Sequence, residues 1–293
     1  VGPSWIDYWY LTENCSYHMF TLLEAANPNV FLTEKSKKYV IPSDTVKTLW
    51  EAPGLVKQFY YRPSVRTEFF TRISELNKME KEELNQITKK KIFSPRYEAL
   101  SKDQKHRILD AAIDYYDFKF SREVQTKDSK ESILKDSVLK KRSEIDLVTP
   151  SLKIQPNFQE SPHFGHGSGR LGVAYQATKN SGDLYTMQYK FALHDQLDPI
   201  LGYPEYAQIN FWDMRASYHT QTRMLDLEDW TLFEVLSMSP IRDFDESVSW
   251  RVKVSLEKIR NENCDFCRFG HFSLGGGYNL QFTEVPNLTG YLG

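Results

Sequence analysis

The chain lacks the features that mark a helical membrane protein, a nucleic-acid-binding protein or a disulfide framework. Its 293 residues contain no run of about 18 apolar residues, which excludes a membrane-spanning helix. The net charge is −2, and the lysines are scattered with no basic stripe carrying interleaved aromatic residues, so we expect no nucleic-acid partner. The opening residues Val1-Gly2-Pro3-Ser4 lack the basic and apolar regions of a signal peptide.

Cysteine is scarce, with three residues in two groups. Cys264 and Cys267 have the spacing of half a metal site or of a tight disulfide. No second Cys or His pair with zinc spacing accompanies them, and they lie between two strand patterns. We therefore interpret them as a loop-pinning disulfide formed in an oxidising compartment, which leaves Cys15 as a free thiol.

Cys15 is expected in the first turn of a helix. The aromatic segment 5–11 has the composition of a strand, and apolar residues then recur at helical spacing until Asn27-Pro28. Thr12 and Asn14 are both candidate N-caps of that helix. Unpaired backbone N–H groups at a helix start favour a thiolate, so Cys15 is our candidate catalytic nucleophile; the alternative is a small buried apolar side chain.

Four segments near the N-terminus form a recognisable set: Glu13-Asn14-Cys15-Ser16-Tyr17-His18, Leu22-Leu23-Glu24-Ala25-Ala26-Asn27-Pro28, Val40-Ile41-Pro42-Ser43-Asp44-Thr45-Val46 and Tyr61-Arg62-Pro63-Ser64-Val65-Arg66-Thr67. Together they resemble the end of the Lnb-type periplasmic domain. That family takes its name from a bacterial lipoprotein N-acyltransferase and is similar to permuted papain-like, NlpC-type cysteine enzymes.

The resemblance implies that Cys15 is the nucleophile and that its histidine lies upstream, in a Gly-His pair on an earlier strand. No such residues precede Cys15 in this sequence. We therefore expect either that the sequence begins inside the domain or that this copy has lost its base. His18 shares a helix face with Cys15, but a histidine so near in sequence rarely reaches well as a base.

The first half of the chain divides by composition into two blocks. Residues 1–68 are predicted to be the C-terminal part of the Lnb/papain-like cysteine domain, with Ser43 capping a short helix and a short strand at 55–61. Residues 69–148 are dominated by charged and polar residues, with apolar positions at helical spacing and Ser101 as one cap. We interpret them as a helical connector without catalytic residues.

Residues 149–169 are predicted to be a linker that ends in a turn rich in glycine and histidine. His163 and His166 could bind a metal or act as a base, and Ser168 could be a nucleophile. The sequence places no matching acid or third ligand beside them. We favour a tight glycine turn that leads into a strand, and we expect neither a metal nor a cofactor. A Gly-His-Gly-Ser segment also opens the C-terminal domain of some Lnb-type proteins, which supports the position of this turn.

From residue 170 to residue 293 the hydrophobic period changes to two, which predicts antiparallel strands joined by hairpins. The clearest strands are predicted at 184–194, 248–257 and 271–282, with weaker ones at 171–178, 212–220 and 230–238, and the start of another at 288–291.

Two architectures would suit such strands, a sandwich with the apolar side inward or an outer-membrane barrel with the apolar side toward lipid. Strands of about 10 residues match the length needed to cross a bilayer. The charged side chains of Arg251, Lys253 and Glu257, with the inward-facing Gly275 and Gly277, favour a lumen. Six or seven strands cannot close an even-numbered barrel of eight or more, so we expect the chain to be truncated at both ends.

The predicted fold class is α+β: the C-terminal part of a papain-like domain, a helical connector, and an antiparallel up-and-down β-barrel of the outer membrane. The predicted location is the bacterial outer membrane, with a periplasmic domain. The first functional hypothesis is a thiol-dependent acyltransferase or hydrolase whose partner is a membrane lipid or lipoprotein. The alternative is a non-catalytic barrel that binds envelope proteins. A third, metal binding through His163, His166 and the cysteine pair, is the least favoured.

Overall fold

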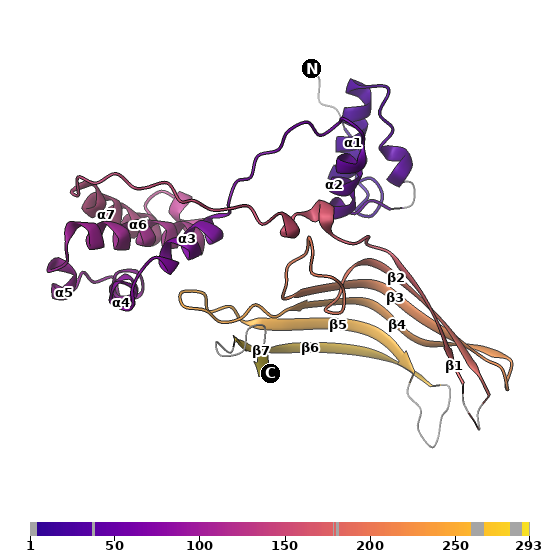
Figure 1. The fold of residues 1–293 in the computed structure, drawn as a ribbon. Helices are drawn as coiled ribbons and strands as arrows, with labels where there is room; N and C mark the ends of the chain where they lie inside the picture. The colour runs from indigo at the N-terminus through magenta and orange to yellow at the C-terminus, as the bar shows by residue number, and fades with distance from the viewer. Residues whose placement is uncertain are drawn as a thin grey trace. The chain divides into compact units, whose positions relative to one another are not determined.

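The structure is a computed structural model that describes residues 5–36, 39–177, 179, 182–258, 267–281 and 289–292. The chain forms two compact units. Unit 1 combines Val1–Gln58 with Asn157–Gly293, and unit 2 is the continuous segment Phe59–Pro156. The first and last parts of the sequence therefore fold together, and the middle of the chain forms a unit of its own (Figure 1).

Unit 1 opens with two α-helices, α1 (Cys15–Ala26) and α2 (Pro42–Glu51), separated by a 3₁₀ turn (Thr33–Ser36). Asn14 caps α1, because its Oδ1 accepts hydrogen bonds from the backbone N–H groups of Ser16 and Tyr17 at 3.0 and 3.3 Å. Its Nδ2 donates to the Val40 carbonyl at 2.7 Å, which fixes the segment before α2. Of the two candidate caps, Thr12 and Asn14, the structure uses Asn14, and the predicted position of Cys15 in the first turn is confirmed.

Three local predictions near the N-terminus are wrong. Neither segment 5–11 nor segment 55–61 forms a strand, because no strand lies beside either one in the described chain to pair with its backbone groups. Ser43 does not cap α2, which begins one residue earlier at Pro42 and has no side-chain cap. Proline suits this position because it lacks the N–H group that a cap would satisfy.

The C-terminal part of unit 1 is one antiparallel sheet whose strands follow each other in sequence order (Figure 1). The strands are β1 (Arg170–Gln176), β2 (Leu184–His194), β3 (Ala207–His219), β4 (Met224–Ser237), β5 (Ser249–Lys258), β6 (Arg268–Gln281) and β7 (Thr289–Leu292). The up-and-down order predicted from the period of two is confirmed. In the predicted hairpin at 179–183, residues 180 and 181 lie outside the described residues; the strands on either side pair antiparallel up to Gln176 and Leu184.

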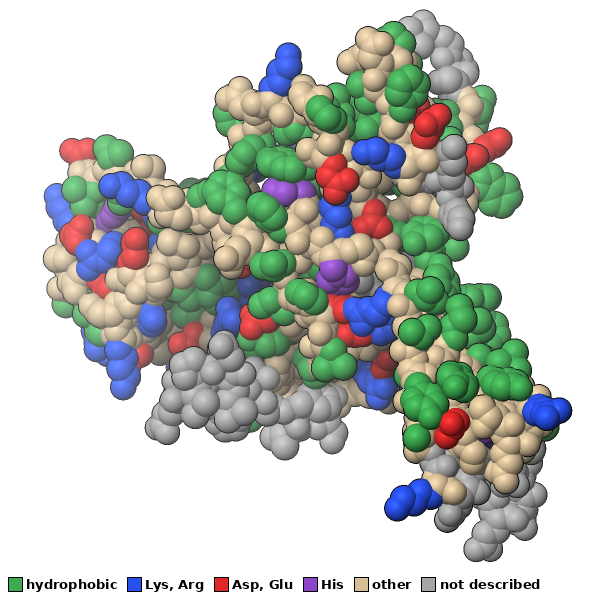
Figure 2. All heavy atoms as spheres, turned by 45° about the vertical axis from the view of Figure 1, so that its right-hand side comes forward, with side chains coloured by type: hydrophobic (Ala, Val, Ile, Leu, Met, Phe, Trp, Pro, Cys, Tyr) green, Lys and Arg blue, Asp and Glu red, His purple; other side chains and the backbone are tan. Residues whose placement is uncertain are grey.

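One side of this sheet, the apolar face, carries large hydrophobic side chains that are exposed. Its most exposed members are Leu171, Val173, Tyr175, Tyr185, Met187, Tyr218, Leu225, Trp250, Phe272 and Leu274. The strand register places them together, since Val173 pairs with Met187, Tyr185 with Tyr218 and Tyr218 with Leu225. Figure 2 shows hydrophobic side chains gathered in the lower right of that view.

The opposite side of the sheet, the ion-paired face, is polar and mostly buried or half-buried, although Arg215 and Arg251 are exposed. It includes Gln188, Asp213, Arg215, Ser217, Asp226, Asp229, Thr231, Glu234, Ser249, Arg251, Lys253, Ser255 and Glu257. Arg251 Nε donates to Glu234 at 2.7 Å, and Gln188 Nε2 donates to Asp213 at 2.6 Å. Ser217 and Ser249 are almost fully buried. The polar face is therefore the less exposed face of the sheet, the reverse of a sheet that packs a hydrophobic core.

The sheet is not closed into the predicted barrel. Within the described residues, β1 pairs only with β2 and β7 pairs only with β6, so both outer edges are open. The seven strands of the described residues, of which β7 has four residues, are fewer than the eight of the smallest transmembrane barrels. This shortage is the physical reason why the two edges do not meet.

Unit 2 is built from helices: α3 (Val65–Ser74), α4 (Lys78–Asn85), a π-helical turn (Gln86–Lys90), α5 (Pro95–Glu98), α6 (Lys102–Lys119) and α7 (Lys130–Ser143). Ser101 caps α6 as predicted, through a capping box with Gln104. α3 and α7 both pack on α6, which carries the buried Ile108 and Leu109. Residue 69, the predicted start of the connector, lies inside α3. No helix of the described chain has both the length and the hydropathy to cross a bilayer.

Candidate functional site

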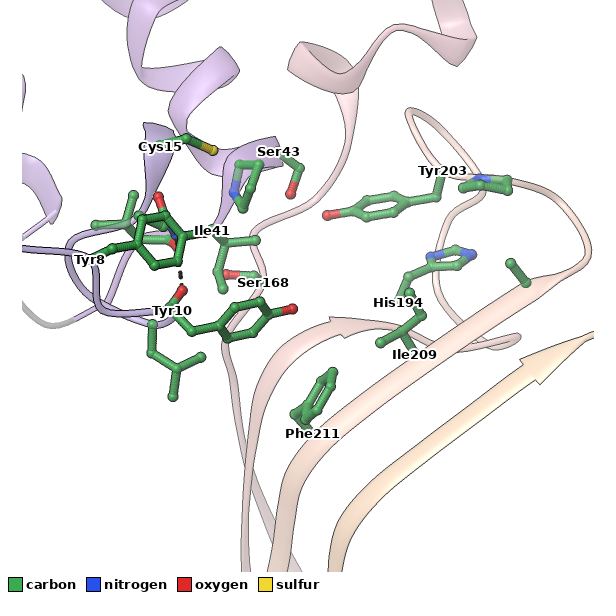
Figure 3. A pocket seen from close by; sticks show the side chains of 16 residues that line it. Tyr8, Tyr10, Cys15, Ile41, Ser43, Ser168, His194, Tyr203, Ile209 and Phe211 are labelled. Atoms are coloured by element: carbon green, nitrogen blue, oxygen red, sulfur yellow. Dashed lines mark hydrogen bonds between the residues drawn. The ribbon is translucent and has the colours of Figure 1, made fainter. Parts of the chain in front are cut away.

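Cys15 lies beside a pocket of unit 1, here called the Cys15 pocket, with a volume of about 320 Å³ (Figure 3). α1 and the segment before α2 form one side of the pocket, and β3 with the loop before it forms the other. Most lining side chains are apolar or aromatic, among them Tyr8, Leu11, Val40, Ile41, Pro204, Ile209 and Phe211. A pocket with this lining suits a hydrocarbon chain better than a charged ligand.

The thiol of Cys15 is free and exposed. Cys15 follows the N-cap of α1, so its sulfur lies near backbone N–H groups that have no intrahelical partner. In the part of the chain that the structure describes, no residue forms a hydrogen bond with its sulfur. His194 lines the same pocket but lies on the side opposite Cys15 (Figure 3). His18 faces elsewhere, with its Nε2 3.0 Å from the Asp7 carbonyl oxygen.

Ser168 lines the Cys15 pocket and is buried, and its hydroxyl donates to the carboxylate of Asp44 on α2. The same carboxylate accepts a hydrogen bond from Lys47 Nζ at 3.1 Å, and Lys47 also donates to the His166 carbonyl. Burial, with smaller effects of Tyr189 and Asp44, raises the pKa of the nearby Tyr39 hydroxyl. Ser168 therefore ties α2 to the glycine-rich turn, and its hydroxyl donates to Asp44 rather than to a histidine.

The glycine-rich turn has the tight geometry that the sequence predicts. Gly165 approaches the Tyr203 ring so closely that an added Cβ would lie 2.8 Å from it. Gly202 has a φ of +75°, and a Cβ there would lie 2.8 Å from the Cα of Gly165. A side chain at either position would force the two loops apart. His163 lies outside this close approach: its Nδ1 lies 2.7 Å from the Ser161 hydroxyl oxygen, and its ring stacks on Trp50 with centroids 3.9 Å apart.

Beside this turn, His166, His194 and Asp198 form a group here called the His166 cluster. His166 Nε2 lies 3.2 Å from His194 Nδ1 and 3.6 Å from Asp198 Oδ2. The Tyr203 ring stacks on both imidazoles, with centroids 4.6 Å apart in each pair. His194 and Asp198 are buried. His166 can be singled out in the sequence but the other two cannot, because no spacing in the chain links the turn before β1 to the end of β2 and the loop that follows it.

The surroundings of the His166 cluster are strongly charged. Arg170 pairs with Asp198 and lies 3.8 Å from Asp195, while Lys190 pairs with Asp195 and lies 3.6 Å from Asp213. Burial would raise the pKa of Asp195, but hydrogen bonds from Lys190 and from the Leu197 N–H outweigh it and lower that pKa.

A second trio of ligand-type side chains, His219, Asp226 and Glu228, lies on the sheet. Asp226 in that trio is already neutralised by Lys258 and Arg268. Elsewhere in the sheet, Cys267 is disulfide-bonded, while Cys264, its predicted partner, lies outside the described residues.

Three family models match the chain in succession. Residues 2–52 match the Lnb N-terminal periplasmic domain, residues 59–153 match a domain of unknown function (DUF7842), and residues 159–292 match another (DUF7840). No curated protein and no solved structure matches the chain. The first match agrees with the resemblance seen in the sequence and indicates a cell-envelope protein. The limits of the second match lie close to those of unit 2.

Proposed function

We propose that this protein works in the outer membrane, with the apolar face of its sheet toward lipid and with Cys15 as an acyl-accepting nucleophile. The observation that carries the proposal is the pattern of the sheet, whose large hydrophobic side chains are exposed on one face while the charged side chains on the other face form ion pairs and hydrogen bonds and are on the whole less exposed. Soluble monomers rarely expose a large contiguous apolar patch. A transmembrane strand shows this same alternation, apolar toward lipid and polar toward the lumen.

Strand length supports the same placement. β2 to β6 have 10 to 14 residues each, and a tilted strand needs about 9–11 residues to cross the hydrocarbon core. Backbone groups cannot stay unpaired in lipid, so the open edges of β1 and β7 require further strands in the membrane. The proposal therefore includes a barrel of which this sheet is one part of the wall.

The position of Cys15 supports the chemical half of the proposal. Cys15 lies in the first turn of α1, beside backbone N–H groups without intrahelical partners, and the adjoining pocket offers an apolar site for an acyl chain. In the first step the sulfur attacks an ester carbonyl, so that a C–S bond forms, the C–O bond breaks and the leaving alcohol takes a proton. An amine or water then attacks the thioester and releases the thiol. The acyl donor is a membrane lipid or lipoprotein.

Mass spectrometry of the intact protein tests this chemistry. After incubation with phospholipid vesicles, the wild-type chain is expected to gain the mass of one fatty acyl group, which hydroxylamine removes. The Cys15→Ser variant is expected to gain no hydroxylamine-sensitive group. An equal gain in both chains would show that the acyl group is attached elsewhere.

A non-catalytic role as a binding component of an envelope assembly is the second candidate. Two observations favour it. The Cys15 sulfur has no hydrogen-bond partner among the described residues, and His194 lies on the side of the pocket opposite Cys15. Under this alternative, neither the wild-type chain nor Cys15→Ser takes up an acyl group, and both bind vesicles equally.

A further inference from the structure

We propose that His166 Nε2, His194 Nδ1 and Asp198 Oδ2 bind one divalent transition-metal ion, with zinc as the best match. Two imidazoles and one carboxylate form a ligand set typical of zinc, and they leave a coordination position for water. His194 lies both in this cluster and on the wall of the Cys15 pocket, so the ion would lie at the edge of that pocket. The proposal does not depend on any chemistry at Cys15.

The spacing of the ligand atoms fits a tetrahedral ion. Bonds of about 2.0–2.1 Å to such an ion place neighbouring ligand atoms about 3.4 Å apart. The distances from His166 Nε2 are 3.2 Å to His194 Nδ1 and 3.6 Å to Asp198 Oδ2, and all three atoms lie within 4.8 Å of one another. A metal ion could therefore bind with small side-chain movements.

The hydrogen bonds around the cluster prepare His166 as a ligand. Its Nδ1 lies 2.8 Å from the Gly167 carbonyl oxygen, and a carbonyl can only accept, so Nδ1 carries the hydrogen and Nε2 is an acceptor. Without an ion, His194 Nδ1–H donates to this Nε2, so metal binding replaces that hydrogen bond and leaves the hydrogen of His194 on its Nε2. A backbone carbonyl that fixes the tautomer in this way is typical of metal-binding histidines. Asp198 is oriented likewise, because Arg170 pairs with its Oδ1 and the Asp195 N–H donates to its Oδ2 at 2.9 Å.

Charge and rigidity also favour a bound cation. Asp195, Asp198 and Asp213 face two cationic side chains, Arg170 and Lys190, which leaves one negative charge in excess. The Tyr203 ring holds both imidazoles by stacking, and the close approach of Gly165 and Gly202 fixes the loops that carry them. The ligands are thus held in place before an ion arrives.

Metal titration of the purified full chain, freed of metal by a chelator, tests the proposal. All chains carry Cys15→Ser, so that the thiol cannot bind the probe. Co²⁺ alone is titrated and its visible absorption recorded, and Zn²⁺ is then added to displace it. His166→Phe keeps a ring beside Tyr203 but removes the ligand nitrogen, and Asp198→Asn removes the carboxylate. His163→Phe is the matched control, since His163 lies three residues away and outside the cluster.

The parent chain and the His163→Phe control are expected to bind one Co²⁺ with a tetrahedral spectrum and to exchange it for Zn²⁺. His166→Phe and Asp198→Asn are expected to bind more than about 100-fold less tightly, beyond the loss typical of a residue outside the ligand set. Melting curves without metal show whether each variant is folded. Full affinity in His166→Phe, or no one-to-one binding by a folded parent chain, would overturn the proposal.

Discussion

His106 makes the stability of unit 2 depend on pH. It is buried on α6 with Nε2 3.2 Å from Asp110 Oδ2, although the two atoms are not aligned for a hydrogen bond. Asp110 is already paired with Arg142 at 2.7 Å and lies 3.9 Å from Arg72. Burial, with the two guanidinium groups, lowers the pKa of His106 below its usual value, although Asp110 acts in the opposite direction.

We therefore expect acid to weaken unit 2 through this residue. An unfolded histidine takes up a proton near pH 6.5, whereas folded His106 does so only at lower pH, so the free energy of unfolding falls between these two pKa values. Above about pH 6.5 the stabilisation is fully present. The His106→Gln variant cannot gain this charge and should lose less stability on acidification.

Hydrogen exchange of the α6 amides in the full chain measures this effect, with both chains compared at about pH 7.5 and about pH 5.5, on either side of the histidine pKa. His106 is the only histidine between residues 59 and 156, so no second imidazole in unit 2 confuses the comparison. Equal loss of protection in wild type and variant at the lower pH would contradict the prediction.

Residue positions could be predicted from sequence where the signal is local. The caps Asn14 and Ser101 act on backbone groups two or three residues away, and both predictions are confirmed. The His166 cluster could not be predicted, because its two imidazoles are 28 residues apart and meet only when the end of β2 lies beside the glycine-rich turn. Whether Cys15 is a nucleophile stays a prediction.

At the scale of elements, the period of two predicted the sheet well. β2 has the predicted limits of 184 and 194, and the other strands begin and end within a few residues of their predictions except at the start of β3 and β4. Segment 5–11 has equally suitable residues but no partner strand, which composition alone cannot reveal. Alternation also could not say which face of the sheet is covered.

The exposed face of β6 offers a test of where the sheet lies. Leu274 is 71% exposed, so in water Leu274→Lys should be neutral or mildly stabilising. In lipid, the same lysine near the bilayer midplane would cost about 2–4 kcal/mol. Leu197→Lys is the matched control, because Leu197 is 94% exposed in the loop after β2.

We expect Leu274→Lys to reduce the fraction of protein that cofloats with phospholipid vesicles, and Leu197→Lys to leave that fraction unchanged. Circular dichroism of both variants checks that the strands are formed. Identical flotation of Leu274→Lys and wild type would contradict the proposal that this face contacts lipid. It would not contradict the description of the sheet.

At the scale of the whole molecule, the hydrophobic core is unevenly shared. Thirteen of the seventeen buried apolar residues of the described chain belong to unit 2, which is about a third of the sequence. Unit 1 contributes only Phe20, Leu32, Val40 and Phe244. Because unit 1 buries so little of its own apolar surface, contact with an apolar medium would stabilise it. Unit 2 has a complete core and does not need such a medium.

Residues 59–156 are therefore expected to fold alone and without detergent. A helical unit of this size should unfold cooperatively with a free energy of about 5–15 kcal/mol. It contains no tryptophan, so far-ultraviolet circular dichroism and tyrosine fluorescence are the two probes, and their urea transitions should coincide.

The complementary expectation is that tryptophan fluorescence of the full chain, which reports unit 1 alone, becomes native-like only after lipid or detergent is added. A broad, probe-dependent transition in the isolated fragment would show that its core depends on unit 1. It would contradict the expectation that unit 2 is stable in water by itself while unit 1 needs lipid.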